Sequence, residues 1–476
     1  MRILDCDCDL AFQLTASSSL SLHLSATQIL APSTLMTSQL LPYAAPSAQI
    51  NAAILPADLL LLIFEKLVSD RAHLPWPQAQ YDLNRARVPF MLAKTCKLWR
   101  RLALSVPSLW SYLGFPNFHQ PIDELELRVS LSKDTPVDIF FQPHSCDPDS
   151  DGARCLAVIH ALAPRWRHVH IHYPGTKRPT DISFAWLTGC AMPHLRSLSL
   201  ESEVAGRDGS QALVGVLPDA PNLRRVLIDD LAINWTLYAQ PVCALTDLTI
   251  SMYTWPTNAL YALLTKVAGT LTSLAIYGLH KRPRSANGGA VPLLKLSQLT
   301  LHGVRWLEHI YAPNLRRLEL ATSHIVTDIT PLFLQFAGIE TLVLWGDLRV
   351  ANLGFLHASA FTGLTHLKIA VPPGYYEIFG RGLRIFSGDC CHVPTIFLSC
   401  LVGTALEPPI WPLLQQVSFG DDADPLPQRI EVEPESVVAL ARGGMVLENE
   451  ETVRLQVHIA PAVTSRDAIE RLLLEP

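Results

Sequence analysis

Three histidines that alternate along one short stretch are the residues in this sequence best suited to chemistry. Single apolar residues separate His168, His170 and His172. On a β-strand, alternate side chains share one face about 6.6 Å apart, so the run could in principle hold a metal ion. No carboxylate or Cys near it completes a ligand set. We therefore expect no metal, and interpret the run as a hydrophilic strand face or as a pH-sensitive patch for a partner.

Other chemistry-bearing patterns are incomplete. The ten cysteines include no Cys-x-x-Cys spacing, so neither a zinc knuckle nor a disulfide framework is indicated. No Gly-rich phosphate loop, Gly-x-Ser-x-Gly elbow or His-Glu-x-x-His motif occurs. Cys96 falls on the apolar side of a predicted helix, where we expect a core thiol rather than a nucleophile. We expect a protein that is not an enzyme and that needs no cofactor.

Composition restricts the function further. The chain has 476 residues, of which 49% are hydrophobic and 17% charged, and about one in six is Leu. This excludes a largely disordered protein. The net charge of −6 comes without a basic tail, so nothing favours nucleic acid as a partner. No apolar run reaches the roughly 18 residues of a membrane helix, and the first ten residues are too acidic for a signal peptide. We expect a soluble protein of the cytoplasm, the nucleus or both, with no membrane partner.

The predicted secondary-structure elements of the chain begin after a long uncharged stretch. No Asp, Glu, Lys or Arg occurs from Leu10 to Ala57, and we interpret residues 1–50 as an unstructured arm with a conceivable targeting or docking role. A helix is predicted from about Pro56 to Val68, with Pro at its start and six apolar residues in succession, so that one neighbour cannot cover its apolar surface. A second helix is predicted from about Pro89 to Ser105, ending at Pro107.

These two stretches resemble a known family. The segments LPADLLLLIFEKLV and CKLWRRLALSVPSLWSYL are similar to the F-box of the large fungal families. The matching residues are Leu55, Pro56, Ile63, Phe64, Cys96, Trp99, Arg100, Ala103, Pro107, Leu109 and Trp110. Ala57-Asp58 replaces the usual Pro-Glu, and the segment between the helices is long. The resemblance implies that residues 51–115 dock on the adaptor subunit of an SCF-type ubiquitin ligase through Leu55, Pro56, Leu59, Leu60, Ile63, Phe64, Leu67 and Trp99.

A Leu-rich motif recurs through the rest of the chain. The pattern L-x-x-L-x-L begins at Trp166, Leu195, Leu223, Leu245, Leu271, Leu296, Leu315, Ile339, Leu364 and Leu414. The steps run from 19 to 29 residues, except for a last step of 50 that suggests one degraded unit near Leu383. The hexapeptide Ala-Pro-Asn-Leu-Arg-Arg occurs twice, from Ala220 and from Ala312.

This period is typical of leucine-rich repeats, in which short parallel strands alternate with return segments. Helical return segments are expected over residues 257–269 and 329–338. The Asn that normally follows the third Leu is absent from every unit, so we expect an irregular solenoid. The predicted fold is α/β: a connecting segment over 116–163 follows the helical F-box, and the repeat array covers 164–476.

Period-2 geometry predicts which side chains this array displays. Positions three, five and seven of each unit point away from the core, onto a concave face. As residues that bind a target protein we propose His168, His170, His172, Arg225, Asp247, Tyr277, His302, Arg317, Trp345 and Lys368. An ordinary solvated sheet face is the alternative for each of them.

The sequence thus predicts a substrate-recognition subunit of an SCF-type cullin–RING ubiquitin ligase. Its partners would be the adaptor, the cullin through that adaptor, and a protein target. The alternative is a leucine-rich-repeat interaction scaffold without ligase association, in which the F-box-like helices only cap the array.

Overall fold

The structure is a computed structural model. It describes residues 55–69, 83–115, 122–142, 151–173, 190–202, 212–214, 219–229, 232–234, 244–251, 257–277, 290–301, 307, 309–321, 338–345, 361–370, 391–393, 413–419, 430–432, 434–443, 445–446, 452–453, 456–460 and 466–474. The chain divides into two units, Met1–Leu55 and Pro56–Pro476, and apart from Leu55 the described residues belong to the second. The predicted arm over residues 1–50 and the predicted helix over 329–338, apart from its last residue, lie outside the described residues.

The described part of the chain contains eight α-helices and two short 3₁₀ helices. The α-helices are α1 (Ala57–Ser69), α2 (Leu83–Thr95), α3 (Lys97–Ser105), α4 (Ile122–Ser132), α5 (Asp151–Ala161), α6 (Thr257–Val267), α10 (Pro434–Gly443) and α11 (Arg466–Leu474). The 3₁₀ helices are η2 (Pro107–Trp110) and η3 (Ala163–Arg165). None of these helices combines the length and apolar content needed to cross a membrane. The predictions of α1 and of α6 are confirmed.

The second predicted helix is wrong in one respect, because two helices occupy its place. Cys96 has an extended backbone, which ends α2, and its Sγ accepts a hydrogen bond from the Trp99 amide at 3.4 Å as the N-cap of α3. Cys96 is exposed, so the prediction of a core thiol is also wrong. A side chain that turns back to cap a helix cannot at the same time face the core.

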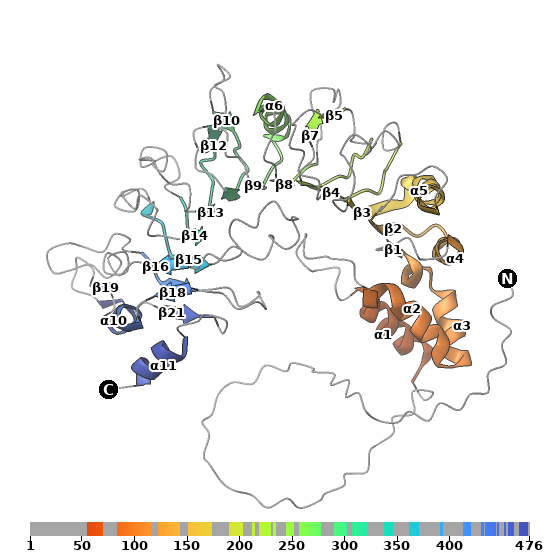
Figure 1. Ribbon diagram of the computed structural model, residues 1–476, viewed down its shortest axis with the longest axis horizontal. Helices are drawn as coiled ribbons and strands as arrows, with labels where there is room; N and C mark the ends of the chain where they lie inside the picture. The colour runs from red at the N-terminus through yellow and green to blue at the C-terminus, as the bar shows by residue number, and fades with distance from the viewer. Residues whose placement is uncertain are drawn as a thin grey trace, which may run out of the picture. The chain divides into compact units, whose positions relative to one another are not determined.

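A single sheet of 13 strands dominates the fold, and all its neighbouring strands are parallel. Figure 1 shows its strands following one another along an arc, with α4, α5 and α6 on the outer side. In order they are β1 (Tyr112–Phe115), β2 (Val137–Phe141), β3 (Trp166–Tyr173), β4 (Ser197–Ser202), β6 (Arg225–Asp229), β8 (Asp247–Ser251), β9 (Ser273–Tyr277), β11 (Gln298–Leu301), β13 (Arg317–Ala321), β14 (Thr341–Trp345), β15 (His366–Ala370), β17 (Gln416–Phe419) and β21 (Gln456–Ile459).

Four two-stranded sheets accompany the main sheet within the described residues. They pair β5 (Ala212–Val214) with β7 (Ala232–Asn234), β10 (Val291–Pro292) with β12 (Ile310–Tyr311), β16 (Cys391–Val393) with β18 (Ile430–Val432), and β19 (Met445–Val446) with β20 (Thr452–Val453). Only the β19–β20 pair is antiparallel.

The Leu-rich motif accounts for ten strands of the main sheet. Each predicted first position is buried, and a strand begins at or two residues after it. The motif's first, fourth and sixth positions, for example Leu195, Leu198 and Leu200, form one continuous core on the outer face of the sheet. The prediction of parallel strands with their Leu positions buried is confirmed. A single short strand buries too little surface to be stable alone, so its stability depends on the neighbouring units.

The sheet begins before the predicted repeat array and has one strand, β21, after the last predicted motif at Leu414. Strands β1 and β2 precede the expected start at residue 164, and β2 and its flanking helices arise from the segment expected only to connect, residues 116–163. Strand β15 pairs directly with β17, so the 50-residue step joins neighbouring strands and no further unit of the main sheet lies between them. The predicted degraded unit near Leu383 falls outside the described residues.

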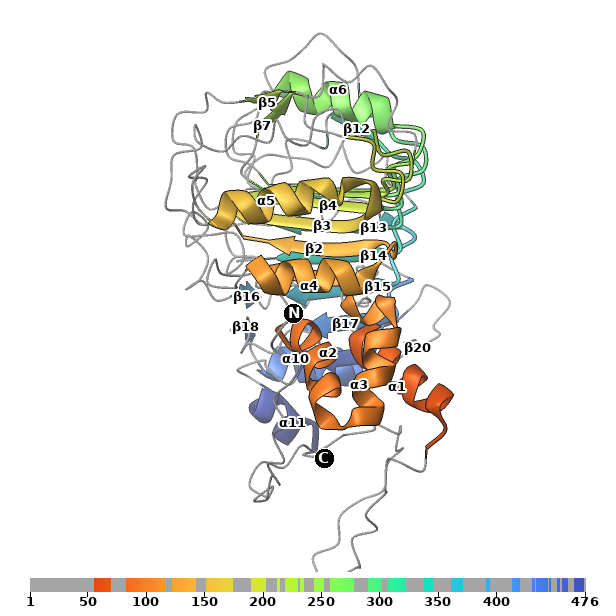
Figure 2. The ribbon, with the colours of Figure 1, turned by 90° about the vertical axis from the view of Figure 1, so that its right-hand side faces the viewer.

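Two tryptophans show that the first strand belongs to a unit of the same kind as the third. Trp110 donates from Nε1 to the Ala103 carbonyl at 2.9 Å, and Trp166 donates from Nε1 to the Ile159 carbonyl at 3.1 Å. In both cases the acceptor lies seven residues earlier, in the helix before the strand, and a 3₁₀ helix intervenes. Helix α3 is therefore bonded to the segment before β1 in the same way as α5 is bonded to the start of β3. Figure 2 shows α4 and α5 lying along the strands across the outer face.

Contacts at position two of each unit connect neighbouring turns. The amide there donates to the position-two carbonyl of the preceding unit, as Thr272 does to Thr246 at 2.8 Å, and the series runs from the unit of β4 to that of β17. Hydroxyls add a second bond at Thr246, Thr272, Ser297 and Thr365, each to the preceding carbonyl at 3.0 to 3.2 Å. These bonds connect each turn before a strand to the corresponding turn of the preceding unit.

Candidate functional site

The first candidate site is an apolar surface on α1. Four of its large aliphatic side chains are exposed, Leu59 by 47%, Leu62 by 61%, Ile63 by 44% and Leu67 by 51%. Their spacing of three, four and eight residues from Leu59 places them on one side of the helix. A soluble chain seldom leaves four such side chains together in water unless another molecule covers them. We call these four residues the α1 stripe.

The opposite side of α1 holds the helix in place. Leu60, Phe64 and Val68 are buried there, and the Phe64 ring meets the Trp99 ring edge-on at 5.0 Å between centroids. The eight predicted adaptor-binding residues therefore divide into two groups. Leu59, Ile63, Leu67 and Pro56 are exposed, whereas Leu60 and Phe64 are buried, and Leu55 and Trp99 are half-buried. Only the exposed group is open to a partner.

The second candidate site is the sheet face opposite the Leu core, and the predicted target-binding residues differ there in exposure. Arg225 is exposed; Asp247, Arg317, Lys368, His168 and His172 are partly exposed; His170, Tyr277 and Trp345 are buried. His302 lies outside the described residues. The strand alternation is as predicted.

The expectation of exposed aromatic side chains on this face is wrong. Tyr277 and Trp345 pack with Ala321, Val343 and Ala370 in an apolar cluster separate from the Leu core. Their sequence positions correctly predicted the side of the sheet on which they lie, but not that neighbouring side chains bury them. Period-2 geometry determines only the side of the sheet. These rings stabilise the fold and are not displayed to a partner.

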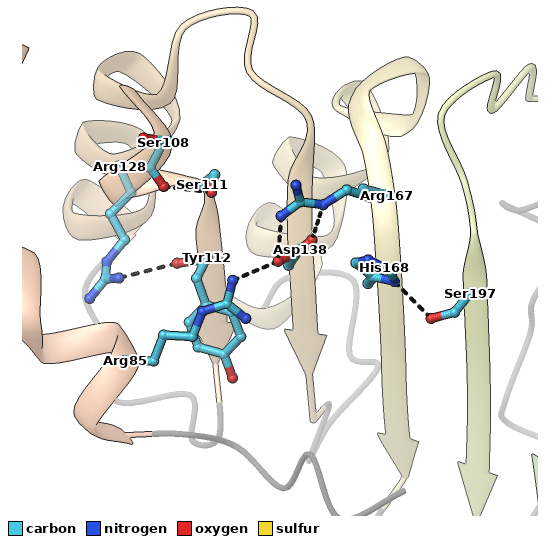
Figure 3. A network of polar contacts seen from close by, with 9 residues as sticks. All are labelled: Arg85, Ser108, Ser111, Tyr112, Arg128, Asp138, Arg167, His168 and Ser197. Carbon is cyan, nitrogen blue, oxygen red and sulfur yellow. Dashed lines mark hydrogen bonds and ion pairs between the residues drawn. The ribbon is translucent and has the colours of Figure 1, made fainter. Parts of the chain in front are cut away.

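A buried carboxylate links three elements at the N-terminal end of the sheet (Figure 3). Asp138 in β2 accepts from Arg167 in β3 through both carboxylate oxygens at 2.8 Å, and from Arg85 in α2 at 2.7 Å. Burial raises the pKa of Asp138, but the hydrogen bond and the charge of Arg167 with the charge of Arg85 lower it by more, so that it lies below 3.8. The carboxylate stays ionised and holds both guanidiniums.

A second arginine in the same region is almost completely buried. Arg128 in α4 donates to the Ala86 carbonyl of α2 at 2.8 Å and to the Tyr112 carbonyl of β1 at 3.3 Å. Glu124, one turn earlier, balances its charge at 2.7 Å. The network of Asp138 and Arg128 therefore joins the helical segment to the sheet through hydrogen bonds with charged groups, which are stronger than neutral ones.

The predicted histidine run occupies one edge of this network. His168 Nδ1 lies 3.0 Å from Ser197 Oγ, and the His170 ring stacks on Phe140 at 4.7 Å between centroids. Burial, with a contribution from His172, lowers the pKa of His170 to about 3, so the imidazole is neutral near pH 7. The run is thus neither a uniform hydrophilic face nor a set of exposed histidines.

Glu201 lies on the same face but was not among the residues predicted for it from the sequence. Its Oε1 accepts from Ser199 Oγ at 3.0 Å and lies 3.6 Å from His170 Nδ1. Burial raises its pKa to about 7, although the Ser199 hydrogen bond works against this rise. The signal available in the sequence was its position: Glu201 is the seventh residue of its unit, beside His172 in the register of the sheet.

The two candidate sites are thus an exposed apolar stripe on α1 and a partly exposed polar face of the sheet. Within the described parts of the chain, no group of three His, Cys, Asp or Glu side chains is placed to hold a metal ion. Comparisons with protein-family models and with curated proteins found no family and no relative that match this chain.

Proposed function

We propose that this protein is a substrate-recognition subunit of an SCF-type cullin–RING ubiquitin ligase, with α1 docking on the adaptor subunit. The observation that carries the proposal is the α1 stripe, four exposed aliphatic side chains on a helix whose other side is firmly packed. Helices of this kind bind by laying the apolar side into a groove of the partner. The F-box-like residues of the sequence favour the SCF adaptor as that partner.

The two groups of adaptor-binding residues would have different tasks. Leu60, Phe64 and Trp99 fix the direction of α1 by packing beneath it, and the α1 stripe makes the contact. Fully burying an aliphatic side chain contributes about 1.5 to 3 kcal/mol, so covering the half-exposed side chains of the α1 stripe contributes a part of the binding energy that must offset the costs of association.

The sheet face would hold the target protein. The receptor itself would break no bond and need no cofactor. It would raise the local concentration of target lysines beside the ubiquitin-conjugating enzyme that the ligase binds elsewhere. Fixed geometry between α1 and the sheet serves this role, and the Asp138 and Arg128 bonds between helices and sheet support it.

A scaffold without ligase association is a second candidate, and one observation favours it. Helix α3 and Trp110 repeat the arrangement of α5 and Trp166, so the helical segment also forms the first unit of the sheet. Solenoid arrays need a terminal unit that covers the end of their core. In this alternative, α1 would shield that unit and dock on nothing.

Co-purification with the SCF adaptor separates the two candidates. The double substitution Leu59→Asp and Ile63→Asp places two charges on the α1 stripe without touching buried side chains, and should abolish adaptor recovery. Leu127→Asp on α4 is the matched control, because Leu127 is 45% exposed on another helix, and it should leave recovery unchanged. Equal recovery with both variants, or no recovery with the unaltered chain, would favour the scaffold.

A further inference from the structure

Arginine occupies position two on three consecutive strands of the main sheet. Arg167, Arg196 and Arg224 precede the position-three residues of β3, β4 and β6. The Arg196 amide donates to the Arg167 carbonyl at 2.8 Å, and the Arg224 amide donates to the Arg196 carbonyl at 2.9 Å. The three residues therefore lie side by side where their strands begin, with adjacent backbones about 4.8 Å apart. Arg225 follows at position three of β6.

These arginines differ in how their charge is balanced. Arg167 forms a two-pronged pair with Asp138. Arg196 and Arg224 are exposed, and their guanidiniums have no carboxylate in ion-pair range among the described residues. Arg225 is also exposed, and its Nε lies 3.8 Å from Asp247 Oδ2, which is longer than a hydrogen bond. We call Arg196, Arg224 and Arg225 the arginine row.

The repeated hexapeptide provides an internal comparison. Arg224 and Arg225 end its first copy, and Arg316 and Arg317 end its second copy at the same positions of a unit. In the second copy, Arg316 lies 3.3 Å from Glu340 and Arg317 lies 2.6 Å from Glu319. With the same local sequence, both arginines of the second copy are closely paired, whereas in the first copy Arg224 has no carboxylate in range among the described residues and Arg225 has only the longer contact with Asp247. The fold does not require the openness of the arginine row.

One member of the row, Arg196, acts on a residue of the face proposed to hold the target. Burial lowers the pKa of His168 at position three of β3; Asp138 opposes this, while the charges of Arg167, Arg85 and Arg196 lower it further. A nearby positive charge disfavours protonation of the His168 imidazole, so these arginines act on it electrostatically. An anion brought to the same place would meet a favourable field.

We propose that Arg196, Arg224 and Arg225 bind the anionic side chains of a peptide segment in the target protein. The inference rests on the proposed role of the sheet as the target-binding surface. Guanidinium groups suit this ligand because each presents a fork of donors that matches a carboxylate or a phosphate ester. Three forks at one edge select a segment with several negative charges over an isolated one.

Fluorescence anisotropy with three labelled peptides tests this inference on the full chain without any adaptor. One peptide carries consecutive Glu residues, the second carries Gln in their place, and the third carries phosphoserine. The Glu peptide, the phosphoserine peptide or both should bind and weaken as salt is added, because exposed charges are screened. The Gln peptide should not bind. The stronger of the two anionic peptides identifies the source of the charge.

Two sets of substitutions locate the binding. The triple variant Arg196→Gln, Arg224→Gln, Arg225→Gln should weaken binding of the anionic peptide by about tenfold or more, a loss of about 1.4 kcal/mol. Its matched control is Arg316→Gln with Arg317→Gln, which removes the same residues from the paired copy and should change binding less than about twofold. Circular dichroism checks that both variants fold.

The inference is overturned if neither anionic peptide binds, if the Gln peptide binds equally well, or if the two variants weaken binding alike. These outcomes are independent of the adaptor experiment, which probes α1. Peptide binding without adaptor recovery would support the arginine row on a scaffold, and adaptor recovery without peptide binding would leave the ligase proposal standing alone.

Discussion

At the scale of single residues, burial shifts the pKa values of two side chains on the sheet face that carries the histidine run. His170 and Glu201 lie on neighbouring strands, and each is less than one-tenth exposed. Burial disfavours the charged form of both groups, so the histidine loses its proton readily and the glutamate keeps its own. His172 and Asp229 flank Glu201 in the register of the sheet. Of His170 and Glu201, Glu201 is therefore the one whose charge state changes near neutral pH.

Stability should depend on pH through Glu201. The unfolded chain releases this proton near pH 4.5, whereas the folded chain keeps it until about pH 7. In that interval the folded state binds more protons, so this residue's contribution falls as pH rises, by on the order of 3 kcal/mol in total. The free energy of unfolding of the unaltered chain, measured in urea, should therefore fall relative to that of Glu201→Gln between pH 4.5 and pH 7.

The comparison with Glu201→Gln cancels the opposite contribution of His170, which both proteins share. Ser199→Ala is the control, because it keeps Glu201 and removes the hydrogen bond that lowers its pKa. This variant should retain the fall and extend it to higher pH. A difference that is flat across the interval, or that rises with pH, would show that Glu201 ionises normally in the folded protein.

At the scale of elements, each unit of the sheet needs bonds to the unit before it. The two copies of the hexapeptide show one way of making them. Asn222 donates from Nδ2 to the Pro193 carbonyl, and Asn314 donates from Nδ2 to the Leu294 carbonyl, each at 2.7 Å. The repeated Asn therefore has the same task in both copies, which explains why the hexapeptide recurs with its Asn.

Removing these amides should loosen the contact between units. Asn222→Ala and Asn314→Ala should each lower the free energy of unfolding by about 1 kcal/mol, the usual net value of one hydrogen bond. The double variant should lose about 2 kcal/mol, because the two sites lie several strands apart and act independently. Urea unfolding followed by circular dichroism measures both values.

Gln415→Ala is a suitable control for the Asn variants. Gln415 is exposed at position two of its unit, and its backbone amide makes the contact to the preceding turn. The substitution should cost less than about 0.5 kcal/mol. Asn variants no less stable than this control would mean that water replaces the side-chain bonds at no cost.

At the scale of the whole molecule, the helical segment and the sheet of residues 56–476 are joined through hydrogen bonds between charged groups. Asp138 contacts α2 through Arg85 and β3 through Arg167, and Arg128 contacts α2 and β1. Such directional bonds hold the helical segment and the sheet in a more fixed relation than apolar contacts alone would. The helices are thus part of the array and not an independent appendage.

Neutralising Asp138 should weaken this connection throughout. Asp138→Asn leaves two guanidiniums beside a neutral amide, and we expect a loss of about 3 kcal/mol in the free energy of unfolding, as for other broken buried ion pairs. Hydrogen exchange should also accelerate in α2 more than in β9 or β13. Asp134→Asn, in the exposed turn before β2, is the control and should cost less than about 0.5 kcal/mol. If both variants lose equally little, the Asp138 network does not hold the helices.

Much of the architecture follows from the sequence because its signals are local and repeated. Spacing of Leu at positions one, four and six determines which residues face the core, since a strand alternates its side chains whatever its neighbours are. The helix α1 follows in the same way from Pro56 and the apolar run behind it. Strands β2 and β21 were not predicted because Pro136 and Arg454 occupy positions where the motif expects Leu. Strand β1 was not predicted because its residues were assigned to the F-box-like segment, although Trp110 takes the place that Trp166 takes in the first predicted unit.

Only the tertiary structure decided which of the predicted surface residues meet water and which charges are open. Trp345 and Arg225 occupy outward positions of the same motif, yet one is buried and the other exposed. Arg224 and Arg316 share a hexapeptide, yet only Arg316 has a carboxylate in range among the described residues. Exposure and charge pairing depend on residues distant in the chain, which a repeat motif does not specify. The sequence determined the sides of each strand, and packing across strands determined what each side presents.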